Sequence, residues 1–96
     1  MELEQLRQLV AFAEYGTLSK AAEVLHLSQP SLSRTMQALE EELQGKLFVR
    51  QKNRIVLNET GWIAVEQARK VLSAAEELAE RVGLAERSRQ SISLGA

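Results

Sequence analysis

The fold of this chain is decided by residues 21–34, which read AAEVLHLSQPSLSR. Small and apolar residues are followed by a short connection at His26-Leu27, and then by a serine and a proline. Ser28 is a good N-cap, and Pro30 is tolerated in a first turn, where backbone N–H groups have no partner within the helix. His is among the few non-glycine residues that tolerate positive φ, so we expect that conformation at His26. The stretch predicts two helices joined by a tight turn.

Helical periodicity extends in both directions from this stretch. Before it, apolar residues recur three and four apart along residues 3–13, which predicts an amphipathic helix that ends at Gly16. Thr17 or Ser19 then caps a short second helix. The third helix, over residues 28–43, is predicted to end at Gly45. Its buried stripe is expected to consist of Leu32, Met36, Leu39 and Leu43.

The opposite face of the third helix carries side chains that form hydrogen bonds, and only one of them is charged. Its members are Gln29, Ser31, Ser33, Arg34 and Gln37, with Thr35 on the flank. Beyond this helix, residues 47–50 and 54–57 are expected to be two short strands joined by a turn at 51–53. A two-stranded ribbon in this place is a wing.

The charges of the wing segment differ from those of the chain as a whole. The net charge is −1, but every charged residue between positions 44 and 57 is basic. These residues are Lys46, Arg50, Lys52 and Arg54. A local basic segment on a neutral body can contact phosphate without a high overall charge.

A long final helix is expected after Asn58, which can serve as its N-cap. It should run to about Arg87, roughly 43 Å at 1.5 Å per residue. Its apolar stripe is longer than so small a domain can cover, so we expect a partner helix. The predicted contact residues are Ala64, Ala68, Val71, Leu72, Ala75, Leu78 and Val82. Residues 91–96 alternate polar and apolar side chains, like the start of a strand.

The composition excludes several classes of protein. There is no Cys, and no set of residues has the spacing of metal ligands, so we expect neither a metal nor a cofactor. A Gly-rich phosphate loop and a Ser/His/Asp set are also missing, so we do not expect an enzyme. The acidic start at residues 1–4 is unlike a signal peptide, and the apolar run at residues 9–13 is too short to span a membrane. We therefore expect a soluble, cytoplasmic protein.

Residues 21–61 closely resemble LysR-type transcriptional regulators. Members of that family have the pattern AA..L..SQ.A.S..I..LE..L...LF.R followed by LT.AG, and this chain matches it in register. The resemblance implies a mostly α fold: a winged helix-turn-helix DNA-binding domain of three helices and a two-stranded wing over residues 1–57, and a dimerisation helix over 58–90. Residues 91–96 would begin a missing C-terminal domain that binds a small-molecule effector.

The resemblance also implies partners and a location. We expect binding to double-stranded DNA at an interrupted inverted repeat, because two antiparallel linker helices relate two recognition helices by a two-fold axis. The full-length protein would be a tetramer in the bacterial cytoplasm, associated with the nucleoid. The recognition helix is expected in the major groove, and the wing on the backbone or minor groove. DNA contacts are predicted for Gln29, Pro30, Ser31, Ser33, Arg34, Thr35, Gln37, Arg50, Lys52 and Arg54.

This chain departs from the family pattern at two positions. Members often have a second Arg three residues after the first, where this chain has Asn53 between Lys52 and Arg54. The wing contact is therefore expected to be shifted. Asn58 replaces the usual Thr, and Asn is an equally good N-cap.

Some residues have a second interpretation. The polar side chains of the third helix and of the ribbon tip can be ordinary solvated surface. Arg50 can instead pair with an acid of residues 40–42 and hold the wing to the helix.

Trp62, Phe48 and Met36 are expected in the core. A protein-interaction module would need exposed apolar residues on the third helix, and RNA is disfavoured because its A-form major groove is too narrow for a helix.

Overall fold

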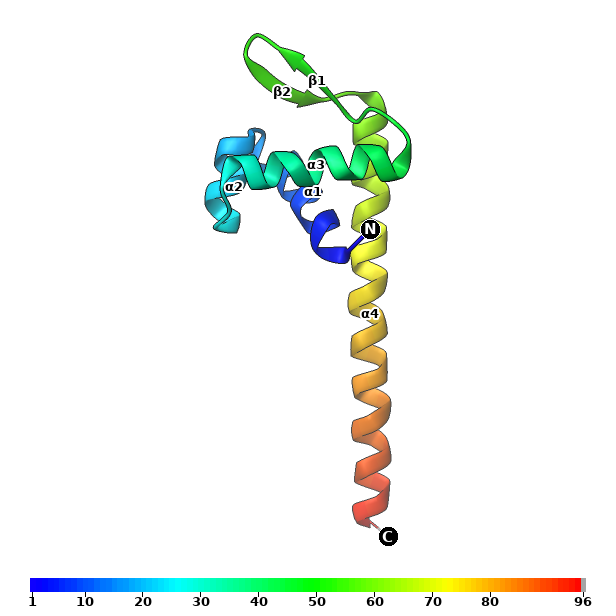
Figure 1. The fold of residues 1–96 in the computed structure, drawn as a ribbon. Helices are drawn as coiled ribbons and strands as arrows, with labels where there is room; N and C mark the ends of the chain where they lie inside the picture. The colour runs from blue at the N-terminus through cyan, green and yellow to red at the C-terminus, as the bar shows by residue number, and fades with distance from the viewer. Residues whose placement is uncertain (96) are drawn as a thin grey trace.

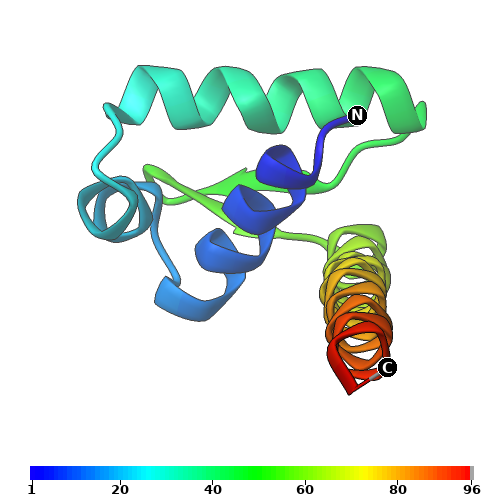
Figure 2. The ribbon, with the colours of Figure 1, turned by 90° about the horizontal axis from the view of Figure 1, so that it is seen from below.

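A computed structural model describes the backbone of residues 1–95 and the side chains of residues 1–89. The elements are α1 (Leu3–Tyr15), α2 (Leu18–Leu25), α3 (Gln29–Leu43), β1 (Phe48–Gln51), β2 (Arg54–Leu57) and α4 (Glu59–Gly95). Helices α1–α3 and the ribbon form one body, and α4 extends far beyond it, giving an overall length of 67 Å (Figure 1). Figure 2 looks along α4, and α3 runs crosswise to this direction, in the plane of the picture. The predicted fold class is confirmed.

The predicted caps start the helices of the helix-turn-helix. Thr17 Oγ1 accepts a hydrogen bond from the Lys20 N–H at 3.1 Å, so Thr17 rather than Ser19 caps α2. Ser28 Oγ accepts from the Ser31 N–H at 3.2 Å at the start of α3. Each bond satisfies a backbone donor that the first helical turn leaves free. The starts of both helices therefore follow from local sequence.

Two left-handed residues end these helices. His26 has φ 58°, as predicted, and ends α2. At the end of α3 the left-handed residue is Gln44, with φ 55°, so the prediction that Gly45 ends the helix was wrong by one residue. The N–H groups of Gln44 and Gly45 donate to the carbonyls of Glu41 and Glu40. This Schellman motif satisfies terminal carbonyls and so offsets the conformational cost at Gln44.

The core lies where α1 meets the other helices. Its largest fully buried side chains are Phe12, Leu9, Leu32, Leu39 and Leu47. Helix α4 adds Val65 and Ala68, each 3% exposed. As predicted, Met36 is buried, and Phe48 packs against the core with its ring edge-to-face on that of Phe12, 5.3 Å between centroids.

Two residues predicted to be buried are exposed. Leu43 is 44% exposed, because the last turn of α3 extends to the margin of the domain. Trp62 is 53% exposed. It follows the buried Gly61 by one residue and is therefore turned by about 100° around the helix axis. Its side chain borders a hollow beside the wing.

The ribbon turn is shorter than the sequence suggested. Strands β1 and β2 pair antiparallel, and their register leaves only Lys52 and Asn53 in the turn, not residues 51–53. Both have positive φ, 44° and 67°, the pattern of a type I′ turn. This turn matches the twist of paired strands, so Gln51 remains in β1 opposite Arg54.

Helix α4 is longer than predicted. Its 37 residues continue through Gly95, so the strand expected at 91–96 is wrong for residues 91–95, and Ala96 lies outside the described residues. A helix already formed gains one backbone bond for each residue added, whereas a short alternating segment needs a second strand to pair with. Among residues 1–95, no helix has the length and apolarity needed to cross a membrane.

Candidate nucleic-acid interface

The N-terminal two thirds of α3 present polar side chains outward. Gln29, Pro30, Arg34 and Gln37 are exposed, whereas Ser31, Ser33 and Thr35 are half-buried. The Thr35 hydroxyl donates to the Ser31 carbonyl at 3.3 Å, within the helix. The donor of Thr35 is therefore already used, and this residue is a weaker candidate for base contact than its exposed neighbours.

The register of the ribbon decides where Arg50 lies. Side chains alternate along a strand, and directly paired residues share a face, so Arg50 lies on the same face as Ile55, Phe48 and Leu57. Phe48 packs on the core, so this face is turned toward the helices. Arg50 accordingly borders two hollows between the ribbon and the helix-turn-helix, of about 250 and 240 Å³.

Each hollow combines the wing with a different part of the helix-turn-helix. The first includes Ser33 and Gln37 from α3, and the second includes Gln29 together with Arg54. Thr17 and Ser19, at the start of α2, also border the second hollow. Local sequence predicts only a capping role for Thr17 and Ser19. Folding places both residues at the same hollow as Arg50 and Arg54 of the ribbon.

The cations of this surface differ from most of those on α1 and α4. Arg34, Arg50, Lys52 and Arg54 are exposed, and none has a carboxylate of the described residues within 4.0 Å. On α1 and α4, by contrast, five of the six cations among residues 1–89 pair with acids, and Arg87 is the exception. The pairs are Arg7–Glu4, Arg69–Glu14, Lys70–Glu66, Arg81–Glu77 and Arg89–Glu86. The wing and α3 thus leave positive charge free for a ligand.

The alternative role considered for Arg50, an ion pair that holds the wing, does not occur. Glu40 holds the wing in another way. Its Oε2 accepts hydrogen bonds from the backbone N–H groups of Leu47 at 2.8 Å and Phe48 at 3.3 Å. Sequence reasoning missed this role, since the run of acids at residues 40–42 gives no indication that one of them turns back to the chain.

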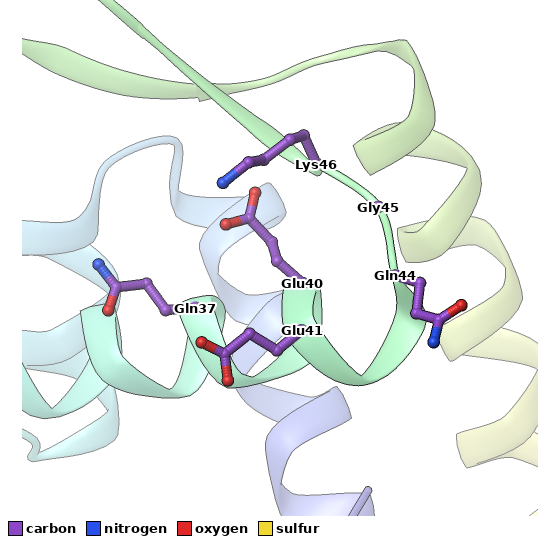
Figure 3. A pocket seen from close by; sticks show the side chains of 6 residues that line it. All are labelled: Gln37, Glu40, Glu41, Gln44, Gly45 and Lys46. Carbon is purple, nitrogen blue, oxygen red and sulfur yellow. The ribbon is translucent and has the colours of Figure 1, made fainter.

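Acidic side chains border the far end of α3. An open hollow of about 510 Å³ is lined by Gln37, Glu40, Glu41, Gln44, Gly45 and Lys46. Figure 3 shows Glu40 reaching toward the segment that carries Lys46, while Gln44 points away from it. Carboxylates repel phosphate, so a surface that binds nucleic acid should end at Gln37, where this hollow begins.

The outward face of α4 changes character along its length. Ala68 is buried in the core of its own domain, and Ala64, Leu72 and Ala75 are half-buried. Farther along, Val71, Leu78 and Val82 are 45%, 67% and 58% exposed. An apolar groove of about 270 Å³ runs beside the first part of α4. Its lining includes Leu6, Leu9, Leu43, Ile63, Ala64, Ala68 and Val71.

Three helices, a tight turn at His26 and a two-stranded ribbon define a winged helix-turn-helix protein. The sequence matches the model of bacterial regulatory helix-turn-helix proteins of the lysR family over residues 3–62. The chain belongs to the LysR family.

Relatives and a solved structure agree with this assignment. The SDS degradation transcriptional activation protein of Pseudomonas sp. is 42% identical over 81 residues, which are 84% of this chain and 26% of that protein. The transcriptional regulator TfdT of Cupriavidus pinatubonensis is 38% identical over 84% of this chain and 36% of its own length. The structure of a CbnR DNA-binding domain in complex with DNA superposes with a TM-score of 0.83 at 40% identity, covering 88% of this chain and 98% of that one. The chain thus spans about a quarter to a third of these two relatives.

Proposed function

We propose that this chain is the DNA-binding and dimerising part of a LysR-type transcriptional regulator, and that it binds double-stranded DNA sequence-specifically and catalyses no reaction. One observation carries the proposal: exposed cations without acidic partners lie beside an exposed helix face of hydrogen-bonding side chains. Phosphate contacts supply affinity, and hydrogen bonds to base edges supply specificity. Both kinds of group are available on this surface.

In the proposed complex α3 lies in the major groove. Arg34 is suited to the O6 and N7 atoms of guanine, and Gln29 and Gln37 to adenine. Lys52 and Arg54, at and beside the ribbon turn, contact phosphate or the minor groove. Arg50 lies beside the hollows between the wing and the helices. It contacts a phosphate between the bases that α3 reads and the site that the ribbon turn binds.

Dimerisation is proposed through α4, because its exposed valines and leucine continue past the domain that buries its first turns. The apolar groove beside residues 63–71 offers a place for the same helix of a second copy. A two-fold axis makes both subunits use the same surface. Two domains related in this way present two recognition helices to an interrupted inverted repeat.

The sizes of the side chains favour one register for this pair. If two antiparallel α4 helices cross near Ser73, Val82 faces the half-buried Ala64 of the partner subunit, and Leu78 enters the groove above the partner's Ala68, which is itself almost fully buried in its own domain. Each exposed bulky residue then meets an alanine at the wall of the groove. Large residues packed against small ones let helices approach closely and fill space.

The same proposal extends to the longer proteins that this chain resembles. A C-terminal domain after α4 would bind a small-molecule effector, and the full-length regulator would form a tetramer in the bacterial cytoplasm on the nucleoid. These features follow from membership of the family and not from the residues of this chain.

Base reading by Arg34 is the direct test. Sequences bound by the chain are first selected from a random duplex pool. Arg34→Ala should then lower affinity for the selected duplex by ~1–3 kcal/mol and relax preference at one base position. Affinity for random duplex should fall much less. Arg7→Ala, which removes an exposed cation paired with Glu4 on α1, is the control and should bind like the wild type. An equal loss on selected and random duplexes would contradict base reading by Arg34.

A further inference from the structure

A short segment before the wing connects three elements of the fold. The backbone N–H groups of Leu47 and Phe48 donate to Glu40 of α3. The carbonyl groups of the same segment accept hydrogen bonds from Asn58, at the start of α4. The Asn58 Nδ2 donates to the Lys46 carbonyl at 2.9 Å, and the Asn58 backbone N–H donates to the Leu47 carbonyl at 2.9 Å. We call these four bonds, with residues 46–48, the polar junction.

Asn58 has two functions in this junction. Its Oδ1 accepts a hydrogen bond from the Gly61 N–H at 2.7 Å and so caps α4. Its Nδ2 makes the separate bond to Lys46. LysR-type sequences usually have Thr at this position, and a Thr side chain has only one polar atom. An amide has an acceptor and a donor on different atoms and can make both bonds at once.

We propose that the polar junction sets the angle between the recognition helix and the dimerisation helix, and that Asn58 thereby narrows the range of half-site spacings that the dimer accepts. Apolar burial of Val65 and Ala68 holds α4 against the domain, but hydrophobic contact is not directional. Hydrogen bonds prefer defined angles and therefore specify direction. This inference rests on the proposed DNA binding and on dimerisation through α4.

The length of α3 turns a small rotation at the junction into a displacement at the DNA. From Glu40, which belongs to the junction, to Gln29 the helix runs roughly 16 Å. A rotation of about 5° at each junction would move the N-terminal end of each recognition helix by about 1.4 Å relative to the two-fold axis. The two half-sites together would then differ by about 3 Å, close to the roughly 3.4 Å rise of one base pair. A tight junction should therefore distinguish spacers that differ by one base pair.

The variant Asn58→Asp keeps the cap of α4 but removes the hydrogen bond to Lys46. Aspartate has nearly the same shape and is an equally good N-cap, but its carboxylate cannot donate to the Lys46 carbonyl. A negative charge at the start of α4 also favours the helix dipole, so α4 should remain folded. Asn58→Thr removes the amide without adding a charge and serves as a second variant.

Affinities are measured on duplexes whose selected half-sites are separated by spacers one or two base pairs shorter or longer than the best one, and on a duplex with a single half-site. Loss of one hydrogen bond corresponds to about a fivefold change in an equilibrium constant. We expect the wild type to discriminate among spacers about three- to fivefold more strongly than either variant. Dividing by the affinity for the single half-site removes any general effect of charge. Identical spacer profiles in wild type and variants would overturn the proposal.

A second measurement needs no DNA. The chain has no Cys, so two introduced cysteines are the only sites that a spin label can modify. Exposed positions are chosen, Glu41→Cys on α3 and Glu76→Cys on α4. Labelled protein diluted with unlabelled protein should give a narrow distance distribution, and Asn58→Asp should broaden it. Gln5→Ala, which removes a bond of similar length at the start of α1, should leave the distribution unchanged. An unchanged distribution in Asn58→Asp would refute the junction. Failure of the wild type to bind any duplex would instead refute the proposed function.

Discussion

Gly61→Ala should destabilise the protein, although alanine is ordinarily the better residue in a helix. A Cβ atom at position 61 would lie 2.1 Å from the Leu47 carbonyl oxygen and 2.9 Å from Leu57 Cδ2. Ordinary contact begins near 3.4 Å, so the backbone at Leu47 or the first turn of α4 must move by more than an ångström. That carbonyl also accepts the Asn58 N–H bond, which the movement would break.

The change in the free energy of unfolding follows from two destabilising effects and one stabilising effect. Overpacking in a tight site costs ~1–3 kcal/mol, and each lost hydrogen bond costs about 1 kcal/mol. Replacing Gly by Ala inside a helix returns up to ~1 kcal/mol. We therefore expect the free energy of unfolding to fall by about 1–3 kcal/mol. It is measured by urea denaturation at a fixed protein concentration, because unfolding of a dimer depends on concentration.

Gly83→Ala is the matched control on the same helix. A Cβ atom there would have its nearest neighbour, the end of the flexible Arg87 side chain, at 3.5 Å. This substitution should raise the free energy of unfolding by ~0.5–1 kcal/mol. If Gly61→Ala were as stable as Gly83→Ala, the close approach of α4 to Leu47 would be refuted.

Three further predictions concern the wing, the helix pair and the N-terminus. Changing Lys52 and Arg54 together to Gln should make the slope of log K against log salt shallower by ~2, and an unchanged slope would place the wing off the DNA. Leu78→Asp should give a monomer in sedimentation velocity and abolish specific binding, since an unpaired carboxylate would enter the helix contact; a variant that still sediments as a dimer would contradict the proposed pairing. The Met1 ammonium bonds to Glu42 at 2.8 Å, which raises the pKa of the amino group above 8.0. Its stabilisation is therefore present below about pH 8 and lost as the pH rises through the raised pKa. An NMR titration of the Met1 amino group checks this, and Glu42→Gln should lower its pKa toward the ordinary value.

Much of the fold could be predicted because its determinants are local. Thr17 and Ser28 cap helices through donors three residues away in the chain, and His26 takes its conformation next to the helix that it ends. Periodicity identified the polar face of α3, since a helix places residues three and four apart on one side. The wing was predicted to within a residue at its turn.

The prediction failed where the burial or the conformation of a residue depends on distant parts of the chain. Periodicity assigned Leu43 to the core, and Trp62 was expected to join the final helix to the small domain, but both side chains are about half exposed. The strand expected at the C-terminal end was an error of the same kind, because a strand requires a partner that local alternation does not supply.

Local sequence was enough to predict the starts of α2, α3 and α4, their caps, the polar face of α3 and the basic character of the wing. Long-range packing was needed to show that Arg50 faces the helices, that Glu40 holds the wing through two backbone N–H groups, and that Asn58 bonds to Lys46. The partners in these last two interactions are seven, eight and twelve residues apart. No repeating pattern in the sequence brings such residues together, and they meet because packing of α1 on α3 and α4 sets where the wing begins.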